Sequence, residues 1–329
     1  MYSLFVNIRN QLYDAGIIKQ IHAPFPVMSI GNISVGGTGK TPITLMVARM
    51  CTELHIPISL LSSGYKRRGK GIIRLIHDKQ LIPSIDPAIV GDEVYLHAES
   101  LIYNSVVSCQ PKYKALSEFI TPILIDDGFQ HRKIFRDLDI VLVNREDMDD
   151  MVLPFGRLRE SCQSLKRAHV IVCTDDMEEQ EVRIYMNEHA LFVRVTMRLD
   201  TPFFLDDELN NDINRNTPIM AVAGIANPKR FLQTLHDNAF NVQHYRWFED
   251  HAEFKDEDTQ TICQEAIQYG CSVIAITEKD EVKLRKQQSI FRSQKIRLLV
   301  IPIHAEIIEG KQSLQKQLLS ICSQYILPE

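Results

Sequence analysis

The residues best suited to chemistry lie in one glycine-rich stretch, SVGGTGKTP, at positions 34–42. Its glycines permit backbone conformations with positive φ, so successive N–H groups can point at one anion. The lysine can reach the outer phosphates of a nucleotide, and the threonine hydroxyl after it can bind magnesium. The stretch therefore predicts a phosphate loop (P-loop) formed by Ser34, Val35, Gly36, Gly37, Thr38, Gly39, Lys40 and Thr41.

Ser34 stands where the usual motif, G-x-x-x-x-G-K-[ST], has its first glycine. That glycine mainly serves the turn, so the serine removes no phosphate ligand. Residues 25–34 are apolar, as in a buried parallel strand. Residues 42–50 have apolar side chains at helical spacing, and Pro42 is tolerated in a first helical turn. This order of strand, loop and helix favours a phosphate site over an ordinary glycine-rich turn.

A phosphate loop needs an acidic partner at the end of a neighbouring strand to hold magnesium. Residues 123–128, ILIDDG, supply Asp126 and Asp127. Ligands in open α/β sheets gather beyond the carboxyl ends of the strands, so we expect both carboxylates to face Lys40 and Thr41. A strand-end aspartate can also simply form a turn. The pairing with a phosphate loop favours a magnesium site made by Thr41, Asp126 and Asp127.

Further polar residues follow at places where a substrate could bind. GFQHRK continues directly from the acidic pair, and GYKRRGKGIIR (64–74) and LPFGRLRES (153–161) are basic segments. Each basic segment fits either a solvated loop or a contact with an anionic substrate or an acidic lipid surface. The candidate substrate or phosphate contacts are Tyr65, Lys66, Arg67, Gln130, His131, Arg157, Arg159 and Glu160.

Asp92 and His251 lie in two further short motifs. GDEVYLHAE (91–99) places Asp92 before a helical pattern, where capping the helix is the simplest role. FEDHAEF (248–254) places Asp250 beside His251 far along the chain. Residue type and spacing alone assign no chemistry to either.

A parallel sheet is needed to bring these residues together. Apolar runs at 56–63, 121–128, 138–144 and 168–174 are typical of buried strands, and they alternate with helical patterns. This predicts an α/β fold, a P-loop NTPase-like parallel sheet flanked by helices. A second, smaller α/β domain begins near residue 219, where Asn227 and Pro228 match the start of a helix.

The length of 329 residues favours two domains. We expect a P-loop core over 1–196, with an N-terminal helix over about residues 1–20. Residues 197–217, rich in Asp, Asn and Pro, indicate a connection, and 218–329 form the smaller C-terminal domain.

Composition excludes several classes of protein. Hydrophobic residues make up 45% and charged residues 24%, a globular balance, and the net charge of −5 argues against a nucleic-acid partner. The seven cysteines contain no C-x-x-C pair, which suits buried thiols in a reducing cytoplasm. We find no signal peptide and no apolar run long enough to span a bilayer.

The N-terminal helix has an apolar face formed by Leu4, Phe5, Ile8, Leu12 and Tyr13. That face fits a membrane interface, and it equally fits a helix packed on a domain. Periodicity alone favours packing.

Eight motifs occur in a fixed order from about residue 26 to 284: NISVGGTGKTP, SSGY, GDEV, DDGFQHRK, LPFGRLRE, GIANPKRF, DH and TEKDEVK. Each motif is weak alone, and the ordered set is specific. Together they resemble the tetraacyldisaccharide 4′-kinase (lipid A 4′-kinase) family, in which serine also occupies the first position of the loop.

The resemblance implies phosphorylation of the 4′-hydroxyl of a tetraacyl glucosamine disaccharide 1-phosphate by ATP with Mg²⁺, giving lipid IVA in lipid A biosynthesis. It implies that Lys40 and Thr41 bind ATP, and that Asp92 and His251 form a catalytic pair in which Asp92 takes the substrate proton. The enzyme would be peripheral at the cytoplasmic face of a Gram-negative inner membrane. An acylated substrate stays in the bilayer, which favours a membrane role for the N-terminal helix.

The chain departs from the family pattern in three places. Ser63 replaces an Arg, Val94 replaces a Pro, and an Arg expected between Ser100 and Asp126 has no clear match, so Lys112 or Lys114 could stand in for it. Two alternatives remain open. One is a P-loop kinase of a soluble small molecule, and the other is a non-kinase P-loop NTPase switch, for which the sequence marks no clear switch segments.

Overall fold

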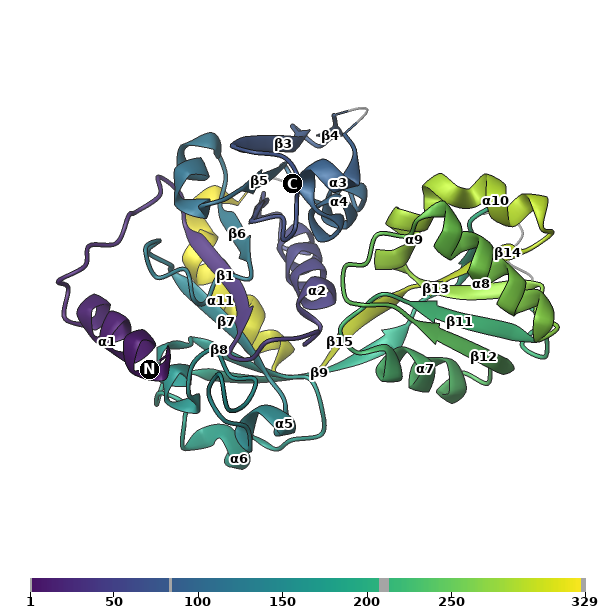
Figure 1. Ribbon diagram of the computed structural model, residues 1–329. Coiled ribbons are helices and arrows are strands. Elements are labelled where there is room, and N and C mark those ends of the chain that lie inside the picture. The colour runs from purple at the N-terminus through teal and green to yellow at the C-terminus, as the bar shows by residue number, and fades with distance from the viewer. Residues whose placement is uncertain (1, 83–84, 207–212, 327–329) are drawn as a thin grey trace. The chain divides into compact units, whose positions relative to one another are not determined.

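The computed structural model describes residues 2–82, 85–206 and 213–326. The chain divides into two compact units: Met1–Met197 with Ala305–Glu329, and Arg198–His304. Each unit has its own sheet with helices packed against it (Figure 1). The chain leaves the first unit within strand β9 (Leu191–Leu199) and returns within strand β15 (Ile303–Glu309).

The sheet of the first unit contains ten strands. Besides β9 and β15 they are β1 (Val27–Asn32), β2 (Ser59–Ser62), β3 (Ile72–His77), β4 (Gln80–Leu81), β5 (Ser105–Cys109), β6 (Ile123–Asp126), β7 (Leu138–Val143) and β8 (Val170–Cys173). Their order is β15-β9-β8-β7-β1-β6-β2-β5-β3-β4, with parallel pairing from β9 to β5. Because β1 pairs with β6, the segments that follow these two strands emerge at the same sheet edge.

The helices of the first unit are α1 (Tyr2–Asp14), α2 (Lys40–Glu53), α3 (Pro87–Val90), α4 (Asp92–Glu99), α5 (Arg145–Met148), α6 (Glu179–Arg183), α11 (Lys311–Cys322) and the 3₁₀ turns η1 (Lys112–Glu118), η2 (Cys162–Arg167) and η4 (Ser323–Tyr325). They cover both faces of the sheet. On one face α2 and α11 pack against alternate strand residues such as Met28 and Ile30. On the other face η1 packs against Val27 and η2 against Val141. The four apolar runs expected as strands contain β2, β6, β7 and β8, so the α/β fold class is confirmed.

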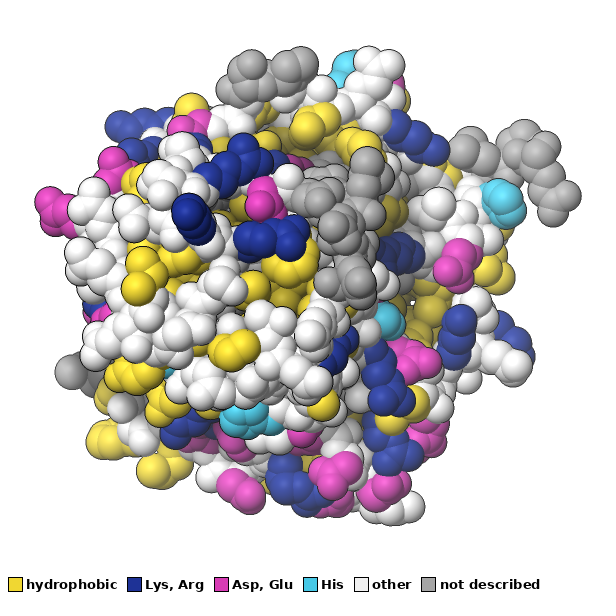
Figure 2. Space-filling view, turned by 90° about the vertical axis from the view of Figure 1, so that its right-hand side faces the viewer, with side chains coloured by type: hydrophobic (Ala, Val, Ile, Leu, Met, Phe, Trp, Pro, Cys, Tyr) yellow, Lys and Arg dark blue, Asp and Glu magenta, His cyan; other side chains and the backbone are white. Residues whose placement is uncertain are grey.

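The second unit is a smaller α/β layer. Its elements are β10 (Phe203–Phe204), β11 (Ile219–Ala223), α7 (Pro228–Asp237), β12 (Val242–Trp247), α8 (Asp256–Gln268), β13 (Val273–Thr277), α9 (Glu278–Leu284), η3 (Arg285–Gln287), α10 (Gln288–Ser293) and β14 (Arg297–Ile301). The strand order is β10-β14-β13-β11-β12, and only β10 runs antiparallel to its neighbour. The side chain of Asn227 accepts the N–H of Arg230 at 3.2 Å, which confirms the predicted helix start at Asn227–Pro228. Figure 2, in which this unit faces the viewer, shows basic and acidic side chains intermingled on its surface.

The division of the chain differs from the expected one. We placed residues 218–329 in the C-terminal domain, but 305–329 belong to the first unit. The reason is packing, because Leu314, Leu318 and Cys322 of α11 are fully buried in the core of the first sheet. Of the expected connection, 197–217, residues 207–212 lie outside the described residues, and the described residues from Arg198 onward belong to the second unit.

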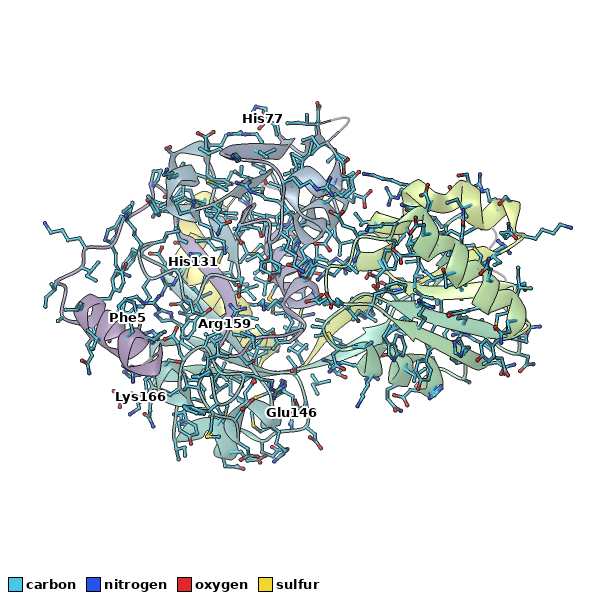
Figure 3. The ribbon with its side chains drawn as sticks, in the orientation of Figure 1. Phe5, His77, His131, Glu146, Arg159 and Lys166 are labelled. Carbon is cyan, nitrogen blue, oxygen red and sulfur yellow. The ribbon has the colours of Figure 1, made fainter. Side chains whose placement is uncertain are left out.

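Helix α1 (Tyr2–Asp14) is shorter than expected, since it ends at Asp14 rather than near residue 20. Gly16 follows with a φ of 70°, a common way for helices to stop. Phe5 and Ile8 on this helix are 73% and 48% exposed. Figure 3 labels Phe5 on α1. The side chain of Leu4 lies outside the described residues. The helix therefore exists, and its membrane role stays a prediction.

Two further expectations concern thiols and membrane spans. All seven cysteines are free and buried. Over the described ranges, the protein contains no helix with the length and apolar character needed to cross a bilayer.

Candidate active site

The phosphate loop connects β1 to α2, as the sequence predicts. Gly36 and Gly39 have φ values of 114° and 84°, a region that residues with side chains rarely adopt. A Cβ atom at Gly39 would also lie 2.8 Å from Cε of Met197. Conformation therefore requires glycine at Gly39, whereas the flexible end of Met197 could move aside for a side chain.

The first half of the loop is fastened to the segment after β7. The N–H of Val35 donates to the carbonyl oxygen of Arg157 at 2.8 Å. Ser34 is buried, and the side-chain amide of Asn32 donates to its carbonyl oxygen at 2.8 Å and to its hydroxyl at 3.3 Å. The serine that replaces the first glycine thus anchors the loop to the protein and leaves its second half to face a ligand.

Lys40, Asp127 and Arg159 form an ion-pair cluster at the carboxyl edge of the sheet. Nζ of Lys40 lies 3.2 Å from Oδ1 of Asn32 and 3.7 Å from Oδ1 of Asp127. Nη1 of Arg159 donates to both carboxylate oxygens of Asp127, at 3.1 and 3.0 Å. Burial alone would raise the pKa of Asp127, but the positive charges of Lys40, Lys112 and Arg159 hold it well below its ordinary value.

Asp126, the residue directly before Asp127, has a raised rather than a lowered pKa. It is 3% exposed, and its Oδ2 accepts a hydrogen bond from Oγ of Ser62 at 3.3 Å. Burial, with the negative charges of Glu93 and Asp127, raises the pKa of Asp126 to about 6. Its Oδ1 is buried and has no hydrogen-bond partner among the described residues. A buried carboxylate oxygen in need of a partner fits a cation ligand.

Thr41, Asp126 and Asp127 fit a magnesium site, because Mg²⁺ needs few protein ligands. Mg²⁺ usually takes one or two carboxylates and completes its shell with water and phosphate oxygens. The described part of the chain contains no group of three or more His, Cys, Asp or Glu side chains suited to a metal. The two aspartates and Thr41, the second residue of α2, are the candidates at this edge.

Lys112 lies at the same edge, and the sequence alone could not choose between it and Lys114 as a substitute for the family's Arg. Lys112 is 1% exposed, and its Nζ donates to the backbone carbonyl oxygens of Asp126 at 2.5 Å and Asp127 at 2.7 Å. Burial lowers its pKa, and the two neighbouring aspartates oppose that shift. No local pattern distinguishes Lys112 from Lys114, which is exposed. Only the fold selects the first of them.

Gln130 and His131 lie at the same edge. Nε2 of Gln130 donates to the carbonyl oxygen of Asn32 at 2.9 Å, and Nη1 of Arg159 donates to its Oε1 at 3.4 Å. Burial, reinforced by the charge of Lys112, lowers the pKa of His131 to about 3, so this imidazole is neutral at physiological pH. Figure 3 labels His131 and Arg159 in the middle of the first unit.

The motifs around Gly64 and Gly91 pack against each other. A Cβ atom at Gly91 would lie 3.0 Å from Cα of Gly64, and both residues have positive φ. Helix α4 starts at the next residue, Asp92, whose carboxylate accepts the N–H of Glu93 at 3.0 Å. Since the charge of Glu93 acts on Asp126, the start of α4 lies near the acidic strand end.

The other expected substrate contacts interact with residues outside the cluster of Lys40, Asp127 and Arg159. They are Tyr65, Lys66, Arg67 and Arg157. Arg67 donates to Oγ of Ser108 at 2.8 Å, and Nε of Arg157 donates to Asp150 at 2.7 Å. Lys66 lies 5.8 Å from the centre of the exposed Tyr65 ring.

Glu160, also expected among the substrate contacts, is 2% exposed. Its Oε2 accepts hydrogen bonds from Asn10 at 2.6 Å and Arg167 at 2.8 Å. A buried carboxylate needs such partners, and these ones tie α1 to the first unit.

In the second unit, three segments converge beyond the ends of the parallel strands β11, β12 and β13. The N–H of His251 donates to the carbonyl oxygen of Gly224 at 3.3 Å. Nζ of Lys279 lies 3.0 Å from Nε2 of His251 and 3.3 Å from Oδ1 of Asp250. Oδ2 of the fully buried Asp280 accepts the N–H of Gly224 at 3.0 Å. We call Gly224, Asp250, His251, Lys279 and Asp280 the His251 cluster.

Asp92 belongs to the other unit, so its pairing with His251 stays a prediction.

Comparison with known proteins gives consistent matches over nearly the whole chain. A family model described as tetraacyldisaccharide-1-P 4′-kinase matches residues 1–323. The tetraacyldisaccharide 4′-kinase of Chlorobaculum tepidum is 33% identical over 98% of this chain and 95% of its own. The enzyme of the same name from Aquifex aeolicus is 33% identical over 88% of this chain and 89% of its own. A crystal structure of LpxK from Aquifex aeolicus in complex with ATP superposes with a TM-score of 0.77 at 28% identity, covering 98% of this chain and 96% of that one.

Proposed function

The chain belongs to the tetraacyldisaccharide-1-phosphate 4′-kinase family, and we propose that it transfers the γ-phosphate of ATP to the 4′-hydroxyl of a tetraacyl glucosamine disaccharide 1-phosphate. The product is lipid IVA, a precursor of lipid A. One observation supports this best: the glycine loop ends in Lys40, and Nζ of Lys40 lies beside the strand-end carboxylate of Asp127. This is the arrangement that phosphoryl transfer from a nucleotide requires.

The loop residues position the nucleotide. Positive φ at Gly36 and Gly39 turns backbone N–H groups toward the phosphates, and Lys40 supplies charge to the outer ones. Thr41, Asp126 and Asp127 would hold Mg²⁺. When bound, the ion neutralises charge that develops on the phosphate oxygens. Arg159 keeps Asp127 ionised and oriented for this role.

We assign Asp92 and His251 as the catalytic pair. Asp92 accepts the proton of the substrate hydroxyl as that oxygen attacks phosphorus, and His251 orients Asp92. An ordinary carboxylate is a weak base, with a pKa near ~4. Phosphoryl transfer has a loose transition state, however, so the proton leaves late and position matters more than basicity. Asp92 lies in the first turn of α4 beside Glu93, whose charge acts on Asp126, and this position supports the role.

The proposed acceptor is a lipid, so the enzyme has to reach it at a membrane surface. We propose that the protein is peripheral at the cytoplasmic face of the inner membrane of a Gram-negative bacterium. Helix α1 supports this, because it is fastened to the first unit through Asn10 while Phe5 and Ile8 stay exposed. Tyr65, an exposed aromatic residue, and Lys66 are candidate contacts for the phosphorylated sugar.

The test is transfer of radiolabelled phosphate from ATP to a panel of acceptors. The panel contains the acylated disaccharide 1-phosphate in detergent, the same disaccharide without acyl chains, and simple sugars. We expect label at the 4′ position of the acylated acceptor, and no transfer by Lys40→Met. Transfer to soluble acceptors only would indicate a small-molecule kinase. ATP hydrolysis without any acceptor labelling would indicate an NTPase switch.

A further inference from the structure

The contact between Lys279 and His251 restricts the protonation of the imidazole. Nζ of Lys279 lies 3.0 Å from Nε2 of His251. An ammonium group carries three N–H donors and no acceptor, so Nε2 has to accept in this hydrogen bond. A neutral imidazole that accepts at Nε2 carries its proton on Nδ1. We propose that Lys279 is a positioning residue that fixes His251 in the Nδ1–H tautomer.

The surrounding residues make Lys279 the deciding partner. The carboxylate of Asp250 lies 3.7 Å from the same Nε2 atom and accepts a hydrogen bond from Lys279 at 3.3 Å. Without the ammonium group, Nε2 would still lie beside the Asp250 carboxylate, which favours a proton on Nε2 instead. Lys279 and Asp250 therefore favour opposite tautomers of one ring.

The backbone holds this geometry in place. His251 has a φ of 61°, which a side-chain-bearing residue adopts only when its surroundings impose it, and its N–H donates to Gly224. A Cβ atom on Gly224 would lie 3.2 Å from Oδ1 of Asp280 and 3.4 Å from the carbonyl oxygen of Glu249, so the approach is close. Lys279 comes from the first turn of α9, whose start Thr277 caps. Three separate segments thus fix one imidazole.

The tautomer of His251 follows from the geometry alone, and only its expected effect on kcat rests on the proposed function. If His251 orients a carboxylate, it has to donate a hydrogen bond, and Nδ1–H is then the donor because Nε2 is occupied. Loss of Lys279 would leave the ring in place and its proton on the wrong nitrogen. Misdirected catalytic groups typically cost roughly 10²-fold in rate.

The experiment is long-range ¹H–¹⁵N NMR of the full chain with labelled histidine, at about pH 8, where ordinary imidazoles are neutral. The signal of His251 is assigned by its loss in His251→Gln. We expect a pyrrole-type Nδ1 and a pyridine-type Nε2 in the wild type and in Lys279→Arg. In Lys279→Met we expect the Nε2–H form, together with a fall in kcat of about 10²-fold and little change in the KM for ATP.

The control is Lys316→Met, which removes an ammonium group from an exposed position on α11. An Nε2–H form in the wild type, or an unchanged tautomer in Lys279→Met, would overturn the inference. A changed tautomer in Lys279→Met together with a normal kcat would support the role of Lys279. It would contradict the catalytic role of His251. Because the NMR signal does not depend on turnover, the two failures can be told apart.

Discussion

Nζ of Lys40 lies 3.7 Å from Oδ1 of Asp127, across the gap between the phosphate loop and the end of β6. These residues are far apart in the sequence and belong to the segments that follow two neighbouring parallel strands, β1 and β6. The pair holds the lysine at the carboxyl edge of the sheet, where open α/β sheets generally bind their ligands.

Lys40→Met should abolish most turnover. The ammonium group stabilises charge on the transferring phosphate, and single contacts of this kind are worth roughly 10²–10³ in kcat. We would measure kcat/KM for ATP under saturating magnesium, with Lys316→Met as the control for removal of a lysine. Near-normal activity in Lys40→Met would remove the phosphate-loop assignment.

Lys112→Met should damage both stability and activity. The change leaves the carbonyl oxygens of Asp126 and Asp127 without their buried donor, at a cost of about 1–3 kcal/mol in the free energy of unfolding. Lys114→Met, two residues away and exposed, is the matched control and should stay within about 0.5 kcal/mol of the wild type. Urea unfolding curves measure the difference. Equal effects of the two substitutions would show that Lys112 does not support the acidic turn.

Asp126→Asn should make the protein more stable relative to the wild type as the pH rises. The folded-state pKa of Asp126, about 6, lies above its ordinary value of 3.8. This carboxyl group therefore contributes stability that is fully present below about pH 4 and is lost as the pH rises through 6. The difference in unfolding free energy between variant and wild type should grow by up to about 3 kcal/mol between pH 4 and 7. Urea unfolding in the presence of a chelator measures it, and a constant difference would contradict the raised pKa.

Asp127→Asn is the matched opposite case. The folded-state pKa of Asp127 is depressed, because Lys40, Lys112 and Arg159 outweigh the effect of burial. Its contribution to stability is present above pH 4 and is lost as the pH falls further. This variant should therefore be destabilised most near neutral pH. A variant as stable as the wild type at pH 7 would show that the ion pairs contribute nothing.

Phe5→Ser combined with Ile8→Ser should weaken binding to anionic liposomes and leave the KM for ATP unchanged. Both side chains are exposed on α1, and burial of each in a lipid interface is worth about 1.5–3 kcal/mol. The loss of binding should exceed roughly tenfold in a sedimentation assay. Ile184→Ser, at an isoleucine that is 71% exposed next to α6, is the control. If the double variant sediments as the wild type does, α1 serves packing only.

Asp92→Ala and His251→Ala should each lower kcat strongly while ATP still binds. If the two residues act as one pair, the double variant should be little worse than the worse single variant, because groups that act as a unit are non-additive. A double-mutant cycle on kcat, with a melting curve for each variant, measures this. Small, additive losses that follow stability would indicate that Asp92 only stabilises the first turn of α4, where its carboxylate accepts the N–H of Glu93, at a cost of about 0.3–1 kcal/mol.

The sequence by itself determined the local parts of the site. Strand, glycine loop and helix are contiguous in the chain, so positive φ in the loop, as at Gly36 and Gly39, and a helix after it could be predicted without the fold, although α2 begins at Lys40, two residues before the apolar run 42–50. The same holds for the helix start at Asn227–Pro228, because a capping interaction spans only a few residues. Apolar runs predicted the parallel strands, since a strand buried on both faces has no polar positions.

Only the tertiary structure decided which residues share an environment. Asp126 and Asp127 are alike in sequence, yet one has a raised and the other a lowered pKa, because three cations converge on Asp127 from other elements. Crossovers between parallel strands bury Lys112 and expose Lys114, and they bring Lys279 to His251. They also return residues 305–329 to the first unit, where α11 covers the sheet. Such contacts depend on strand order, which spacing along the chain does not encode, whereas a glycine loop depends only on its own backbone.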